Sequence, residues 1–399
     1  MYVTIIAVTM GGMCMALLSM TLGTGRVRVQ AENTQRSFYA AEAGLSDVFM
    51  RMDEGLLDVP EDEPLLVGSQ AAPVPFGTSA YFVEVRTIDS RSYSLISTGI
   101  DGRDQERLEL VLAEAPSGFF QFAAFGADGV VLDSNAFIDS YDSSVGSYAS
   151  QLQPGEDFAR ENGDVGSNSD IHLQANTEIH GDARPGPGGI LDDSAPNTYV
   201  SGSTDPSEEL VELPPIEIPS IPSAGQLVGT SNVTLGPGLV HYDSILMQGG
   251  TTLTIRGPAT LVADSFEMKA NTQLLFETTD GPIELYAPGD FVLRSNSTVV
   301  TRSDSALDVT LLLAGNNTTK NPPDRLELGS NADFVGAIYA PYATFSLNSN
   351  FTIFGSIMCG FLDLSSFGAI HFDEALLYDG WGSSDEFEAA LWRRLTPNP

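Results

Sequence analysis

The stretch LGSNADFVGAIYAPYATFSLNSNFTIFGSIMCGFLDL, residues 328–364, contains two similar halves. Asn331 aligns with Asn350 at an offset of 19 residues. A period near 20 with short β-rich runs is typical of a β-solenoid, in which a coil buries its inner side chains only by stacking on its neighbours. At this offset four apolar pairs also align: Phe334 with Ile353, Ile338 with Ile357, Ala343 with Leu362, and Phe345 with Leu364.

A short motif in this stretch recurs between Phe119 and about Leu377. It consists of an apolar residue, any residue, a small residue and then asparagine. Asparagine tolerates the left-handed backbone conformation that a sharp corner needs, and stacked asparagines hydrogen-bond from one coil to the next. We therefore predict a ladder of corner residues formed by Asn135, Asn176, Asn271, Asn296, Asn331 and Asn350.

The N-terminus is different in character. Tyr2 to Gly23 carries no charged side chain and is long enough, at about 1.5 Å per residue, to cross a bilayer. Apolar residues continue at helical spacing to Leu57, before Pro60, and predict one helix on the order of 80 Å long. The side chains expected to mediate assembly through this helix are Tyr2, Ile5, Ile6, Val8, Met13, Leu17, Leu18 and Leu22.

These patterns predict an α+β chain, with a long transmembrane and amphipathic helix, a small antiparallel sheet and a right-handed β-helix. The expected domains are residues 1–57 (1–24 hydrophobic), 58–116, 117–380 and 381–399. Three strand-like runs lie in residues 80–113. A proline-rich excursion occupies residues 185–226, and residues 384–394 have the spacing of a short amphipathic helix that caps the last coil.

The composition excludes several classes of partner. The chain has 18 Lys+Arg against 53 Asp+Glu, a formal net charge of −35, which repels nucleic-acid phosphates and anionic lipid. The two cysteines, Cys14 and Cys359, lie in different sequence environments, so no disulfide is expected. Since no Cys/His cluster is present either, we expect no cofactor and no structural zinc.

Two groups of motifs carry a resemblance to known families. The apolar start and the run Phe38-Tyr39-Ala40-Ala41-Glu42-Ala43-Gly44-Leu45 resemble type IV pilins of the minor (PilX-like) type. The runs DSYDSS at 139–144, GAIYAP at 336–341 and HFDEAL at 371–376 are similar to a solenoid domain attached to such N-termini. Position five is Ile5, where most such pilins carry glutamate, which leaves shaft and tip positions both open.

The resemblance implies a structural subunit of an extracellular pilus-like filament. Its expected partners are further copies of itself in a helical homopolymer, other pilins, and the cytoplasmic membrane before assembly. The alternatives are a low-copy tip pilin or adhesin that binds a surface or glycan and, less favoured, a membrane-tethered carbohydrate-active enzyme. No catalytic motif supports an enzyme, and Asp139 and Asp142 are the best acidic pair for a metal or a reaction.

Several asparagines also lie in N-x-S/T sequons. Asn316 and Asn317 fall in a predicted loop between Gly315 and Pro323, and are the expected acceptors if the chain is glycosylated.

Overall fold

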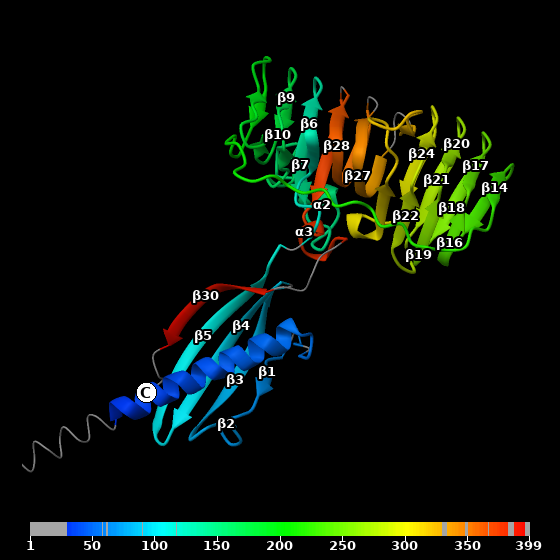
Figure 1. The fold of residues 1–399 in the computed structure, drawn as a ribbon. Coiled ribbons are helices and arrows are strands. Elements are labelled where there is room, and N and C mark those ends of the chain that lie inside the picture. The colour runs from blue at the N-terminus through cyan, green and yellow to red at the C-terminus, as the bar shows by residue number, and fades with distance from the viewer. Residues whose placement is uncertain are drawn as a thin grey trace, which may run out of the picture. The chain divides into compact units, whose positions relative to one another are not determined.

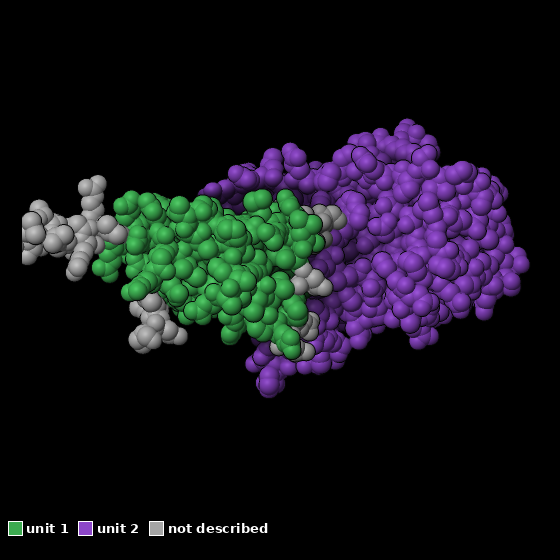
Figure 2. Space-filling view, turned by 90° about the horizontal axis from the view of Figure 1, so that it is seen from below, with its two compact units in different colours: residues 1–115, 385–399 green, residues 116–384 purple. Residues whose placement is uncertain are grey.

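The computed structural model describes residues 30–57, 59–60, 63–89, 91–116, 118–328, 333–347, 350–365, 367–381 and 387–395. The chain divides into two compact units, coloured green and purple in Figure 2. We call residues 1–115 with 385–399 the helix–sheet unit, and residues 116–384 the coil unit. The coil unit is therefore an insertion in the chain of the helix–sheet unit.

The helix–sheet unit packs one helix on an antiparallel sheet (Figure 1). The helix occupies residues 30–53 and buries Ala41, Leu45, Val48 and Met52, which lie three or four positions apart on one face. The strand order is β1-β3-β4-β5-β30, with β2 also on β3. The strands are β1 (Leu65–Val67), β2 (Val74–Phe76), β3 (Ser79–Asp89), β4 (Ser92–Asp101), β5 (Asp104–Glu114) and β30 (Phe387–Leu395).

Small residues set the close approach of this helix to the sheet. A Cβ added at Gly44 would lie 2.5 Å from Ser97 Oγ, and one at Gly99 would lie 1.9 Å from the Ser37 carbonyl oxygen. Ala41 is fully buried between them. The AAEAGL run is thus explained by packing, because larger side chains at these positions would push the helix off the sheet.

The predicted fold class is wrong. The described chain is mostly β, with strand residues outnumbering helical ones several-fold, and it is not a long helix with a small sheet. Among the described residues the N-terminal helix covers residues 30–53, and no described helix has the length and apolarity needed to cross a membrane. The predicted assembly residues Tyr2 to Leu22, and Cys14, lie outside the described residues.

The C-terminal segment also differs from its prediction. Residues 387–395 form β30, which pairs antiparallel with β5 in the helix–sheet unit, and not a helix that caps the coils. Trp392 lies opposite Leu110, and its indole ring is 6.3 Å from the Phe38 ring in an edge-to-face contact. The β5 edge offers unpaired backbone groups, and pairing with them overrides the helical spacing of the sequence.

The coil unit is built from parallel strands that stack in three sheets. The first sheet contains 15 described strands: β6 (Ala124–Leu132), β7 (Phe137–Tyr141), β8 (Val165–Ser167), β9 (Ile171–Leu173), β10 (Glu178–Ile179), β11 (Ala183–Arg184), β12 (Leu191–Asp192), β13 (Tyr199–Val200), β16 (Gly238–Tyr242), β19 (Ala259–Ala263), β22 (Ile283–Ala287), β25 (Val309–Leu313), β27 (Asp333–Leu347), β28 (Thr352–Leu364) and β29 (Ala369–Asp373).

Two smaller sheets complete the coils. One contains β14 (Gln226–Gly229), β17 (Ser244–Met247), β20 (Phe266–Met268), β23 (Phe291–Leu293) and β26 (Leu326–Glu327). The other contains β15 (Val233–Leu235), β18 (Thr252–Arg256), β21 (Gln273–Glu277) and β24 (Thr298–Thr301). Short helical turns are α2 (Tyr148–Gln151), η1 (Ala306–Asp308) and α3 (Leu376–Asp379).

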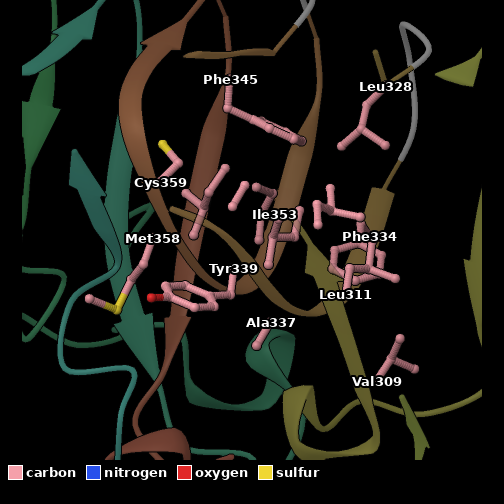
Figure 3. Close-up of a cluster of buried hydrophobic side chains, with 14 of the residues drawn as sticks. Val309, Leu311, Leu328, Phe334, Ala337, Tyr339, Phe345, Ile353, Met358 and Cys359 are labelled. Carbon is pink, nitrogen blue, oxygen red and sulfur yellow. The ribbon is translucent and has the colours of Figure 1, made fainter. Parts of the chain in front are cut away.

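Rows of apolar side chains fill the interior between these sheets. One row crosses four coils, because Leu261 pairs with Leu285, Leu285 with Leu311, and Leu311 with Ile338. All four are almost fully buried, and Figure 3 shows Leu311 within the core cluster beside Phe334 and Ile353. Repeated placement of similar residues in successive coils gives the weak sequence period its physical meaning.

The order of the coils along the stack is not their order in the sequence. The N-terminal strands β6 and β7 lie in the middle of the stack, and the chain proceeds from them to β13 at one end. Residues 201–225, which we call the strap (green in Figure 1), then lead to β14. The later coils return from there to the middle. There β28 pairs with β6 and β29 with β7, at a junction we call the seam.

The strap corresponds to most of the predicted proline-rich excursion and is anchored along its length. The Asn168 side chain donates to the Val211 carbonyl and accepts from the Val211 N–H, both at 2.8 Å. The Tyr339 hydroxyl donates to the Pro214 carbonyl, and Ile216 is buried against the core. The strap is therefore part of the packed unit.

The offset of 19 residues holds only for the first half of the aligned pair. Phe334 pairs with Ile353 and Ile338 with Ile357, as predicted. After a register shift between Ala340 and Thr344, Phe345 pairs with Leu362, so the two later alignments are wrong. The irregularity includes Pro341, which has no N–H to donate to the ladder.

Candidate functional site: the seam cluster and the corner ladder

The seam brings together two of the motifs that carry the resemblance. In the parallel pair β7–β29, His371 lies opposite Asp139, Phe372 opposite Ser140, and Asp373 opposite Tyr141. The two runs are more than 200 residues apart in the sequence. We call the polar side chains gathered here the seam cluster: Asp139, Ser140, Asp142, Tyr148, Arg160, Asn162, His371, Asp373 and Glu374.

The centre of the seam cluster is a buried carboxylate–imidazole pair. Asp139 Oδ1 accepts from His371 Nδ1 at 2.5 Å, and Asp139 Oδ2 accepts from the Tyr148 hydroxyl at 3.0 Å and the Ala159 N–H at 2.9 Å. The imidazole also packs on the Phe354 ring, with centroids 4.8 Å apart. Burial, and the neighbouring Asp139 carboxylate, raise the pKa of Tyr148 well above its ordinary value.

The two acidic residues that follow on β29 and its turn are equally engaged. Asp373 accepts from three backbone N–H groups, those of Ser143 at 2.9 Å, Ala306 at 2.9 Å and Ala375 at 3.2 Å. Burial nevertheless raises the pKa of Asp373 above its ordinary range, because desolvation of the carboxylate outweighs these hydrogen bonds. These bonds connect β29 to the β7 turn and to η1.

Glu374 joins the cluster to a loop that follows α2. Its Oε1 accepts from the Ser140 hydroxyl at 2.8 Å and the Asn162 amide at 2.9 Å, and its Oε2 accepts from Arg160 at 2.8 Å. The same Arg160 nitrogen lies 3.6 Å from Asp142 Oδ2. Arginine therefore balances part of the negative charge that this buried site collects.

The hydrogen bonds of the seam cluster indicate a structural role for Asp139 and Asp142. Every carboxylate oxygen of Asp139, Asp373 and Glu374 has a protein partner at hydrogen-bonding distance. Asp142 Oδ1 accepts from the N–H and hydroxyl of Ser144, at 2.9 and 2.5 Å. A metal at Asp139 or Asp142 would have to displace these bonds, so the geometry supports a structural cluster in preference to a metal or catalytic site.

The corner asparagines form the second distinctive feature. Asn135, Asn176, Asn271, Asn296 and Asn350 all have φ between 58° and 62°, while Asn331 lies outside the described residues. Asn176 donates its amide to Asn135 at 3.1 Å, and Asn296 to Asn271 at 3.5 Å. The left-handed corner follows from the side chain's tolerance of positive φ, and the stacked amides add bonds between coils.

Three further corner residues were not predicted. Asn197 has φ 60° and donates to Asn176 at 2.9 Å, although its coil lacks the apolar residue of the motif. Gly250 has φ 80°, and its N–H donates to the Asn271 carbonyl. Phe367, with φ 61° and 61% exposed, takes the corresponding corner at the seam, where its N–H donates to the Ser134 carbonyl. Asparagine and glycine both tolerate positive φ, so residue type could have indicated corners at Asn197 and Gly250. Nothing in the sequence indicates one at Phe367.

The two sequon asparagines differ in their surroundings. Asn317 Nδ2 donates to the Thr344 carbonyl at 2.7 Å, and its Oδ1 accepts from the Thr344 N–H at 2.8 Å. A glycan on that nitrogen would remove one of these bonds. Asn316 Oδ1 caps the loop by accepting from the N–H groups of Thr318 and Thr319. The Asn316 Nδ2 also donates, to the Thr319 hydroxyl at 2.9 Å. Glycosylation therefore stays a prediction at both asparagines.

Comparison with known proteins gives one family match and several weak structural likenesses, two of which follow. The family described as "Domain of unknown function (DUF7305)" matches residues 193–378, under half of the chain. No curated protein matches. The competence-associated pilin ComZ from Thermus thermophilus is similar at 12% identity with a TM-score of 0.31, over 91% of this chain and 97% of that one. An ice-binding protein from the Antarctic ascomycete Antarctomyces psychrotrophicus is similar at 13% identity with a TM-score of 0.29, over 65% and 96%.

The family match and the fold have different boundaries. Residues 193–378 include the strap and every coil from β14 to β29. They omit β6 and β7, on which β28 and β29 pair, and they omit Asp139. The matched segment is therefore one part of the stack, and the seam cluster is complete only with residues from outside it.

Proposed function

We propose that this chain is a structural subunit of an extracellular, type IV pilus-like filament, which displays its coil unit at the cell surface. Assembly through the apolar segment Tyr2 to Gly23 would put further copies of the chain, and other pilins, around it. The coil unit would be a right-handed β-helix. The protein would act by assembly and display, without catalysis.

The observation that carries this proposal is the point of insertion. The coil unit enters after β5 and leaves before β30, two strands that pair with each other in the helix–sheet unit. Its own ends also meet, since the Gly118 N–H donates to the Leu377 carbonyl at 2.7 Å. Because the coil unit is connected to the chain only between β5 and β30, the N-terminal segment is free to mediate assembly while the coil unit is displayed.

The seam cluster supports the non-catalytic part of the proposal. Its acidic groups are buried and hydrogen-bonded to protein, whereas a hydrolase would need a carboxyl pair open to substrate and water. The large acidic excess agrees with display in a salty exterior, where ions screen self-repulsion.

The test is imaging and fractionation of filaments from cells that express the full chain. We expect the protein in sheared surface filaments, and expect Leu17→Arg with Leu18→Arg to remove it from them. Leu239→Arg is the matched control, because Leu239 is an exposed apolar residue of the coil unit. A chain that never enters filaments, or one whose incorporation survives the double substitution, would refute the proposal. Copy number per filament separates a shaft subunit from a tip adhesin.

A further inference from the structure

A second polar cluster lies where the strap joins the coils, away from the seam. His241 is on β16, Asp243 follows that strand, and Asp264 follows β19, the next strand of the sheet. One ligand atom from each of the three side chains lies within 4.8 Å of the other two. Neither the seam nor the proposed assembly accounts for this group.

The imidazole of His241 is oriented by the strap. Its Nδ1 lies 2.9 Å from the Ile221 carbonyl oxygen, and a carbonyl can only accept, so Nδ1 carries the hydrogen. Ser223 also forms a parallel bridge with His241, and the Ala224 N–H donates to the His241 carbonyl. The ring position is thus fixed by backbone groups outside the cluster.

This orientation places two hydrogen-bond acceptors against each other at the other ring nitrogen. In the neutral imidazole Nε2 carries a lone pair, and it lies 3.0 Å from Asp264 Oδ1, which also accepts. Two acceptors at this distance repel unless a positive charge lies with them. That charge is either a second proton on the ring or a bound cation, and the Asp243 carboxylate adds a further negative group beside it.

We infer that His241, Asp243 and Asp264 bind a divalent first-row metal ion, with Zn²⁺ as the best match. One imidazole nitrogen with two carboxylates is a donor set that zinc accepts, and solvent would complete the tetrahedron. A histidine ligand whose other nitrogen donates to a backbone carbonyl is the usual arrangement at metal sites. The Asp264 side chain is half exposed, which gives an ion access from solvent.

The consequence of binding would be mechanical. His241 Nδ1 contacts the strap, while the three ligands come from the ends of two adjacent strands. One ion would therefore hold the end of the strap, β16 and β19 together at the end of the stack opposite β13. A folded-state ligand of this kind raises the unfolding temperature with its concentration.

The experiment is a Zn²⁺ titration of the full chain in mild detergent, followed by calorimetry and thermal unfolding. We expect one site per chain and a higher unfolding temperature with Zn²⁺. Asp243→Asn and Asp264→Asn should each weaken binding about tenfold or more, because each loses one charged ligand. His172→Ala is the matched control, since His172 lies 3.5 Å from Asp192 but belongs to no group of three possible ligands among the described residues.

The pH dependence tests the competing source of positive charge. The Ile221 carbonyl and Asp264 raise the pKa of His241, so protons compete with the metal and binding should be tighter at pH 8 than at pH 6. Absence of a one-site isotherm at pH 8 would overturn the inference and leave an imidazolium–carboxylate ion pair. The inference would also be overturned if Asp243→Asn and Asp264→Asn bound Zn²⁺ as tightly as the parent chain, because the ion would then lie elsewhere.

Discussion

The chain closes on itself at two junctions, and they are built differently. At the seam, β29 pairs with β7, and the carboxylates of Asp373 and Glu374 are buried among protein donors. In the helix–sheet unit, β30 pairs with β5, and Glu109 and Glu106 accept from Arg393 and Arg394. Those two arginine side chains are 57% and 53% exposed, whereas the glutamate side chains that they contact are 11% and 7% exposed. The two junctions therefore differ in the exposure of the carboxylates' partners, and not in the burial of the carboxylates.

The difference teaches how burial sets the value of a polar contact. Solvent and salt screen the exposed arginines, so each pair contributes on the order of 0–1 kcal/mol. A buried carboxylate that loses its partners costs about 3–5 kcal/mol, because it cannot regain the hydration it gave up. The seam should therefore respond to changes of a single atom, while the β5–β30 junction should hardly respond.

The largest effect is expected from Asp373→Asn at the seam. The substitution keeps the shape and replaces one oxygen by an NH₂ group. At Oδ2 this group would face the Ala306 N–H, and at Oδ1 it would face the N–H groups of both Ser143 and Ala375. We expect a loss of about 2–4 kcal/mol in the free energy of unfolding of the coil unit. Urea unfolding followed by Trp381 fluorescence, in a Trp392→Phe background, measures it.

Two controls define what is special about the seam. Leu285→Met alters a fully buried core residue of an ordinary coil by a similar volume, and should cost less than about 1.5 kcal/mol. Asp193→Ala removes an exposed carboxylate and should change stability by less than about 0.5 kcal/mol. Equal losses for Asp373→Asn and Leu285→Met would mean that the seam is held by packing alone.

The corner asparagines could be predicted from the sequence, and the pairing at the seam could not. The corner asparagines could be predicted because a left-handed corner depends on one residue and recurs locally. The pairing of His371 with Asp139 joins segments more than 200 residues apart, and no local rule connects them. Asp139 and Asp142 were selected as an acidic pair, but their partners Tyr148 and Arg160 could be assigned only in three dimensions.

A smaller loss of stability is expected at the strap. The strap connects the two ends of the stack, because the chain starts in the middle and returns there from the far end. Asn168→Ala removes both hydrogen bonds to Val211, at a cost of roughly 1–2 kcal/mol. Limited proteolysis should cut residues 201–225 faster in this variant. Asn168→Asp keeps the acceptor and loses the donor, and should fall between the variant and the parent chain. Cleavage at unchanged rates in both would mean that Ile216 and its neighbours anchor the strap without Asn168.

The corner at the seam should gain stability when it is made like the others. Phe367 adopts φ 61° with an exposed ring, where neighbouring coils use asparagine or glycine. We expect Phe367→Asn to stabilise the coil unit by about 1 kcal/mol, since a left-handed backbone strains phenylalanine more than asparagine. Thermal unfolding measures the change. Phe367→Ala retains Cβ and the strain, so an equal gain from alanine would assign the effect to the lost ring.

The β30 junction explains the other error of prediction. Residues 387–394 contain Phe387 and Leu391 at helical spacing and several good helix formers. The strand forms because β5 presents backbone groups for pairing, together with Glu109 and Glu106 for the two arginines. These partners lie about 280 residues earlier in the chain, so the local pattern could not include them.

The smallest effect is expected at this junction, from Glu109→Gln. The Arg393 guanidinium, and the Ser94 hydroxyl, lower the pKa of Glu109 below its ordinary 4.5. A carboxyl group whose pKa is lower in the folded than in the unfolded chain stabilises the fold at any pH above its unfolded pKa. This contribution is lost as the pH falls through the folded pKa. The variant should therefore be less stable by roughly 0.5–1 kcal/mol at pH 7. The difference should shrink as the pH falls below 4.5 and vanish once the pH is below the folded pKa.

Trp392 fluorescence in a Trp381→Phe background reports β30 directly, because Trp392 lies on that strand. Glu388→Gln, an exposed residue of the same strand, is the matched control and should show no difference at either pH. A loss at Glu109 as large as that of Asp373→Asn would contradict the comparison, since exposure of the arginine would then not have weakened the pair. A loss that persists when Glu109 is protonated would assign the effect to the amide group of the variant and not to the lost charge, because a protonated glutamate and a glutamine can both accept from the Ser94 hydroxyl.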